Sequence, residues 1–174
     1  AFNLGQHEET LRQQNLSVSI DPLSPDALQN GAIIQYLIGN LDAAEHGLRA
    51  SIQISPTFVG NHLYLGQVFL QRRDARGALS EMLAEPGGGR DFGLALAYHA
   101  LGRKAESDAA LARLTRTSGN LSPMNVAIAH AYRGERDQAF AWLEKAVDER
   151  DSLVGQKFYD EPKLEPLRID PRYK

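Results

Sequence analysis

Cysteine is absent from this chain, which excludes disulfides, thiol nucleophiles and thiolate metal ligands. No apolar run approaches the roughly 18 residues that a membrane-spanning helix needs, and no secretory signal is present. Neither charge dominates, since 19 Lys and Arg against 22 Asp and Glu leave a net charge of −3. Nucleic acids require a clustered basic surface and anionic membranes attract polybasic segments, so we expect neither as a partner.

The motifs of several enzyme classes are also missing. No Ser lies in a G-x-S-x-G context, and no two histidines are three or four residues apart, as a metal pair on one helix would be. His99 and His130 fall in equivalent regions of neighbouring helices, so a shared metal is a minor alternative to ordinary packing. Gly87, Gly88 and Gly89 lack the GK[ST] ending of a phosphate loop, which favours a helix-breaking loop. We predict no catalytic residue, no cofactor and no metal.

What the sequence does contain is a repeat. Gly5 and Gly39 lie 34 residues apart, and so do Pro22 and Pro56. A shared offset of this size indicates a helical repeat. Gly at a turn tolerates a positive φ and ends one helix. Pro cannot continue the second helix, but it fits the first turn of the next.

The spacing of apolar residues predicts an all-α fold in a single domain, residues 1–174. We expect an incomplete first repeat over 1–22, with a helix near 6–20, then four helix pairs over 23–149. Ser24 and Ser122 each precede Pro and are predicted N-caps. The eight paired helices are expected at about 26–38, 41–54, 58–72, 75–85, 91–101, 104–116, 123–133 and 136–149.

Residues 150–174 are predicted to cap the stack, because the last unit of a repeat array must cover an exposed apolar end. We expect an irregular stretch over 150–160 and a short helix near 161–168. The side chains expected to fold back around Trp142 and Leu143 are Phe158, Tyr159, Leu164 and Leu167.

The residues of these units resemble the tetratricopeptide repeat (TPR) family, a resemblance that extends to about residue 149. The best match is a set of small and apolar positions around one turn, namely Ala127, Gly134, Ala139, Leu143 and Ala146. Elsewhere Ser51 and Ser107 replace an expected Ala, and Arg73 replaces the turn Gly. The resemblance implies an α-α superhelix, a solenoid of antiparallel helix pairs whose first helices line a concave surface.

In this family the concave groove usually holds a peptide or a protein segment. A mostly apolar groove with amide and aromatic side chains would favour a hydrophobic or helical segment. Packing between neighbouring pairs is the alternative role for each residue. Gln29, Ile33, Leu63 and Gln67 stand where the carboxylate-binding version needs Lys, Arg and Asn, so we expect no carboxylate clamp. The candidate groove residues are Gln29, Ile33, Tyr36, Leu63, Gln67, Gln71, Phe92, Leu96, His99, Ile128 and Tyr132.

The segments 141–146 and 164–173 resemble the ending of many bacterial repeat domains. Such domains often follow an adenylate cyclase, kinase or winged-helix head, so the resemblance implies a cytoplasmic, protein-binding regulatory piece of a larger signalling protein that is not itself an enzyme. A stand-alone adaptor of secretion or envelope machinery and a hydrolase in a helical groove stay open as alternatives. A homodimer is a further expectation, because the incomplete first repeat leaves a helix that could pair with a second copy.

Overall fold

A computed structural model of the protein describes residues 12, 21, 23–119, 122–157 and 161–173. Apart from Arg12, the helix predicted near 6–20 lies outside the described residues, as do Phe158 and Tyr159. Within them every regular element is a helix, and none is long and apolar enough to cross a bilayer. The helices are α2 Pro25–Leu37, α3 Leu41–Ile54, α4 Asn61–Gln71, α5 Ala75–Ala84, α6 Arg90–Ala100, α7 Lys104–Ser118, α8 Pro123–Tyr132, α9 Arg136–Asp148, α10 Ser152–Lys157, and the 3-10 helices η1 Pro162–Leu167 and η2 Pro171–Tyr173.

The sequence prediction of helix pairs is confirmed, with two corrections. The expected start of α4 near residue 58 was wrong, because Gly60 takes a φ of 94° and the helix begins only after this left-handed residue. The expected irregular stretch over 150–160 was also wrong, because α10 lies within it. The closing helix predicted near 161–168 is the 3-10 helix η1.

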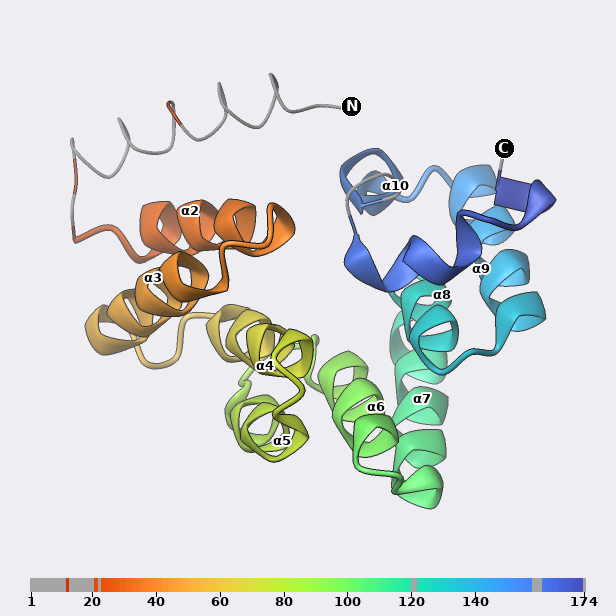
Figure 1. Cartoon of the computed structure of the whole chain (residues 1–174), viewed down its shortest axis with the longest axis horizontal. Helices are drawn as coiled ribbons and strands as arrows, with labels where there is room; N and C mark the ends of the chain where they lie inside the picture. Colours follow the sequence, from red (N-terminus) through yellow and green to blue (C-terminus); the bar gives the residue numbers. More distant parts are fainter. Residues whose placement is uncertain (1–11, 13–20, 22, 120–121, 158–160, 174) are drawn as a thin grey trace. The chain divides into compact units, whose positions relative to one another are not determined.

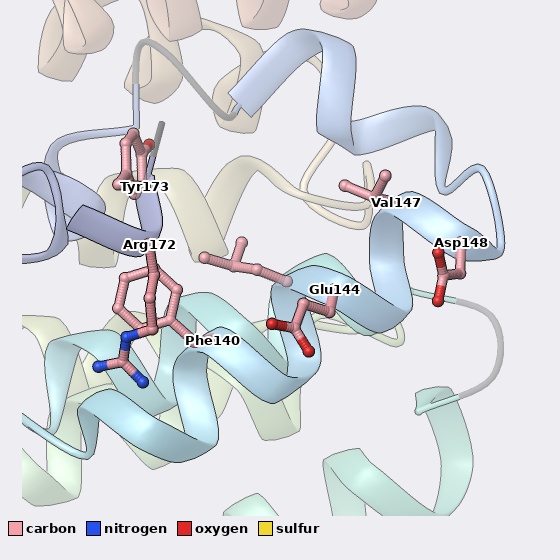
Figure 2. A pocket seen from close by; sticks show the side chains of 7 residues that line it. Phe140, Glu144, Val147, Asp148, Arg172 and Tyr173 are labelled. Carbon is pink, nitrogen blue, oxygen red and sulfur yellow. The ribbon is translucent and has the colours of Figure 1, made fainter. Parts of the chain in front are cut away.

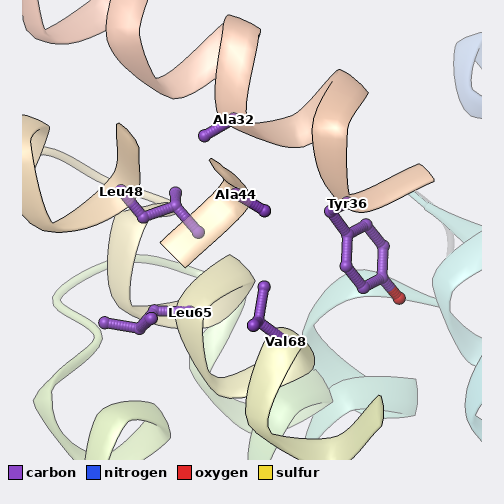
Figure 3. Close-up of a cluster of buried hydrophobic side chains, with 6 residues drawn as sticks. All are labelled: Ala32, Tyr36, Ala44, Leu48, Leu65 and Val68. Carbon is purple, nitrogen blue, oxygen red and sulfur yellow. The ribbon is translucent and has the colours of Figure 1, made fainter. Parts of the chain in front are cut away.

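The chain divides into two compact units, residues 1–90 and 91–174. In the first unit α2 packs against α3 and α4 against α5, while α3 also contacts α4 (Figure 1). Its core is a cluster of fully or almost fully buried side chains (Figure 3). The cluster comprises Ala32, Tyr36, Ala44, Leu48, Leu65 and Val68.

The second unit contains α6 to α9 and the closing helices. Ser107 Oγ in α7 donates to the carbonyl oxygen of Ala95 in α6 at 2.7 Å, and Arg113 Nε donates to Asp91 Oδ1 at 2.8 Å. These bonds hold α6 and α7 together. α8 packs against α7 and α9, and η1 packs against α8.

The turn inside each of the four pairs is built in the same way. A left-handed residue follows the first helix of each pair. It is Arg73, with a φ of 63°, between α4 and α5, and it is a glycine in the other three pairs, namely Gly39, Gly102 and Gly134. At the first turn the Gly39 N–H donates to Tyr36 O at 3.1 Å and the next N–H donates to the carbonyl five residues back. The repeated bonds are those of a Schellman C-cap.

Side-chain caps fix the starts of α2 and α8. Ser24 Oγ accepts from the Ala27 N–H at 3.2 Å, which confirms that predicted N-cap. Ser122 is the N-cap residue of α8, as predicted, but its hydroxyl makes no capping bond. Asp151 takes over this role: its two carboxylate oxygens accept from the N–H groups of Met124 and Leu153, each at 2.9 Å. Asp151 therefore caps α8 from across the pair and also starts α10.

The closing segment buries the two leucines singled out in the sequence. Leu164 and Leu167 of η1 are fully buried, and η1 packs against α8. Trp142 lines a hollow with Leu111 and Thr115 of α7. Lys145 Nζ lies 4.7 Å from the centre of the Trp142 ring. Trp142 therefore packs beside the preceding pair.

Candidate functional site

The candidate residues of the first unit lie on α2 and α4, the first helices of its two pairs, which contact one another. Ile33, Leu63 and Gln71 are half-buried, so part of each side chain is accessible. Tyr36 is fully buried and Gln67 is 2% exposed. Tyr36 and Gln67 thus stabilise the pairs, whereas Ile33, Leu63 and Gln71 have surface to offer a ligand.

Gln29 is already engaged within the protein. Its Nε2 donates to Val59 O at 2.9 Å and to Asn61 Oδ1 at 3.1 Å. These bonds join α2 to the loop and first residue that begin α4. Gln29 therefore orders the boundary between the two pairs.

The loop predicted to break the helix near Gly87 to Gly89 closes over the start of α4. A Cβ added at Gly89 would come 2.6 Å from Leu63 Cδ2, and one at Gly87 would come 2.4 Å from a Val59 methyl. Glu85, just before this loop, is 1% exposed and accepts backbone hydrogen bonds. The glycines thus let the loop approach α4 closely.

The candidate residues of the second unit lie on α6 and α8. Phe92, Leu96 and Ile128 are buried. His99 is exposed and Tyr132 is half-buried, and their ring centres lie 5.8 Å apart in an edge-to-face arrangement of 71°. The structure therefore joins an exposed ring of α6 to a half-buried ring of α8.

Burial and neighbouring charges shift the pKa values of both side chains. Lost hydration of the His99 ring, aided by the charge of nearby Arg133, lowers the pKa of His99 below its usual 6.5. Burial raises the pKa of Tyr132 above its usual 10.0, although Lys163 opposes the shift. At neutral pH the pair is therefore an uncharged aromatic surface.

Arg133, which the sequence analysis passed over, is the centre of a polar cluster. Its side chain is only 5% exposed and donates to Ser107 Oγ at 2.6 Å, to Glu135 Oε1 at 2.7 Å and to Asp108 Oδ1. His130 Nδ1 lies 2.6 Å from the other Glu135 oxygen. Burial raises the pKa of Glu135, but the bonds from Arg133 and His130 outweigh it and leave that pKa lowered. The cluster joins α7 to α8.

The hydrogen bonds of this cluster fit a role in holding helices together better than a role in nucleophilic catalysis. The Ser107 hydroxyl donates its proton to the Ala95 carbonyl and accepts from Arg133, and neither partner is a base that could activate it. His130 is held by Glu135 instead. The idea that His99 and His130 share a metal gains no support, because the described residues include no group of three or more metal-ligating side chains.

Solved structures with a similar fold exist, although their sequences differ widely from this one. No protein-family model matches the chain, and no curated protein matches its sequence. Two crystal structures of MamA superimpose with TM-scores of 0.58 and 0.57 at 16% identity, covering 87% of this chain and 92% and 86% of theirs. YrrB, a TPR protein with an unusual peptide-binding site, gives 0.51 at 17% identity, over 88% of this chain and 85% of its own.

The fold is that of a TPR-like helical repeat. The all-α class and the antiparallel helix pairs predicted from the sequence are confirmed. Sequence identities of 16–17% are too low to carry a ligand across. Binding by the eleven candidate residues therefore stays a prediction, for which the accessible members are the ones to test.

Proposed function

We propose that this chain is a protein-binding module that holds a segment of another protein along its first helices. The support is the TPR-like arrangement of helix pairs, a fold that includes a peptide-binding protein, YrrB. One helix pair cannot bury its apolar face alone, and stacking such pairs creates extended surfaces suited to binding chains. We further propose that the module regulates or recruits for a larger bacterial signalling protein in the cytoplasm.

The binding surface is assigned to the accessible candidates. In the first unit these are Ile33, Leu63 and Gln71, and in the second they are His99 and Tyr132. All five lie on first helices. The first unit contributes aliphatic side chains and one amide, the second contributes an uncharged aromatic pair, and no Lys or Arg is among the five. Each of these two surfaces favours an apolar or amphipathic helical segment over a strongly charged one.

Buried candidates are unsuitable for testing this surface. Truncating Tyr36 to Ala would remove a fully buried aromatic side chain and cost about 3–5 kcal/mol of folding free energy. Loss of binding would then report unfolding. Gln71 is a better position for a test variant, because it is half-buried at the end of α4. Gln53 is the matched control: it is an exposed Gln near the end of α3, the second helix of its pair.

The experiment selects ligands for the whole protein from a displayed library of random peptides. Affinities of selected peptides are then measured by fluorescence anisotropy with Gln71→Arg, Ile33→Arg and Gln53→Arg. We expect the selected peptides to be apolar or amphipathic. Their affinity should fall about tenfold or more with Gln71→Arg and with Ile33→Arg, because a buried unpaired charge opposes apolar contact. Gln53→Arg should bind as the wild type does.

Equal weakening by Gln71→Arg and Gln53→Arg would contradict the assignment to first helices, and a failure to select any peptide would contradict peptide binding. The gene context separates the signalling role from a stand-alone adaptor: a cyclase, kinase or winged-helix segment encoded before this chain supports the first. Homodimer formation is tested separately by sedimentation equilibrium.

A further inference from the structure

A second hollow lies between α9 and the closing helix η2, and none of the candidate residues of the first helices lines it (Figure 2). Its volume is about 370 Å³, which is at the small end of the range for ligand sites. One wall is α9 and the other is formed by Arg172 and Tyr173. The α9 side chains that line it are Phe140, Leu143, Glu144, Val147 and Asp148.

The floor of this hollow is apolar. Phe140 and Leu143 are each 5% exposed, so the fold already covers most of their surface. Val147, one helical turn further along α9, is 56% exposed. The Arg172 guanidinium lies 4.1 Å from the centre of the Phe140 ring and closes one end. An apolar side chain entering the hollow would cover Val147 and exclude water from it.

The rim carries uncompensated negative charge. Glu144 and Asp148 are exposed and form no ion pair with any residue that the structure describes. The opposing Arg172 is already neutralised, because it donates to Asp137 at 3.0 Å and to Asp170 at 2.9 Å. Its guanidinium lowers the pKa of Asp170 to about 2, so Asp170 stays ionised. The local excess of carboxylates favours a cationic ligand group.

The position of the two acids on α9 strengthens this argument. Both lie in the C-terminal part of the helix, and Asp148 is its last residue. The negative end of the helix dipole disfavours a carboxylate in the last turn, so Asp148 is not placed for helix stability. A bound cation would relieve that repulsion.

We propose that this hollow docks a segment of another protein that presents an apolar side chain one helical turn from Arg or Lys. The apolar group would cover Val147 and the cation would pair with Glu144 and Asp148. This site is independent of the proposed first-helix surface, and its ligand is distinguished by a required basic residue.

The probes are two pools of short helical peptides added to the whole protein. Both pools have a fixed apolar residue, followed one turn later by Arg in one pool and by Glu in the other. Binding is read from NMR shifts of the Val147 and Leu143 methyl groups. We expect the Arg pool to bind and the Glu pool to bind at least tenfold more weakly, as expected when two exposed ion pairs become like-charge repulsions.

Charge reversals test the roles of the two acids. Glu144→Lys and Asp148→Lys should together weaken the Arg pool about tenfold while raising the melting temperature, because a cation suits this end of the helix. Glu149→Lys is the matched control: it reverses a charge at the C-cap of the same helix, outside the residues that line the hollow. Its affinity for the Arg pool should equal that of the wild type.

Three results would overturn the proposal. They are equal binding of both pools, an equal loss of affinity with Glu149→Lys, and a self-association that Val147→Asp abolishes, which would make a second copy the occupant. Ile33→Arg should leave the Arg pool unaffected, so failure here and failure of the first-helix surface are distinguishable.

Discussion

Replacing Arg73 by Gly should stabilise the protein by about 1 kcal/mol. Arg73 has a φ of 63° at the turn between α4 and α5, where the equivalent turns of the other pairs have Gly. A left-handed conformation costs a non-glycine residue roughly 1–2 kcal/mol, while the extra chain entropy of Gly offsets about 0.5–1 kcal/mol. The Arg73 side chain forms no hydrogen bond or ion pair with the residues that the structure describes, so we expect nothing else to be lost.

Urea unfolding followed by circular dichroism measures this gain, and the melting temperature should rise by about 2–4 °C. Arg76→Gly is the control: it removes the same charge from an exposed position inside α5, where Gly should instead destabilise by up to about 1 kcal/mol. If Arg73→Gly lowered the free energy of unfolding as much as Arg76→Gly does, the left-handed turn shared by the four pairs would be contradicted.

Three other perturbations probe capping, ionisation and the closing segment. Glu85→Ala should lower the free energy of unfolding in urea by roughly 2–4 kcal/mol, because the carboxylate accepts from the N–H groups of Gly60, Leu63 and Gly87. The control is Asp26→Ala, which removes an exposed carboxylate and should cost under about 0.5 kcal/mol. Folding lowers the pKa of His99, so just below pH 6.5 the unfolded chain binds more protons than the folded chain. The free energy of unfolding should therefore fall as the pH is lowered below 6.5, and His99→Gln should reduce this pH dependence. Deleting residues 156–174 should lower the melting temperature by uncovering the apolar surface under Leu164 and Leu167, and an unchanged value would count against the capping role.

The helices could be predicted from the sequence because their signals are local. Gly39, Gly102 and Gly134 end first helices through a backbone conformation that glycine adopts cheaply. Pro25 and Pro123 begin first helices because Pro suits the first turn. Each of these signals acts within a few residues, so the phase of the repeat identifies the elements. Boundaries shifted where a left-handed residue such as Gly60 intervened.

The caps that cross a pair could not be predicted, because they depend on tertiary contacts. Asp151 bonds the Met124 N–H from 27 residues away, and Glu85 bonds the Gly60 N–H from 25 residues away. The sequence around Ser122 satisfies the local rule for an N-cap, yet the bond goes to the distant carboxylate. A local pattern therefore located the helix start and misidentified its partner.

The accessible part of the candidate surface was also beyond sequence reasoning. Tyr36 and Ile33 have similar helical positions, but only the structure shows that Tyr36 is completely covered. One overlooked signal was present: Ser51 and Ser107 stand where the repeat expects Ala. A hydroxyl in such a buried position needs partners. Both serines donate to a first-helix carbonyl and accept from the following pair, at Asn61 and at Arg133.

The most direct test of binding along the first helices is an amide NMR shift map of the whole protein with a library-selected peptide. We predict that the largest shifts fall on α2 and α4 in the first unit, around Ile33 and Gln71, with α3 and α5 nearly unchanged. Shifts concentrated on α3 and α5 would contradict the proposed binding surface.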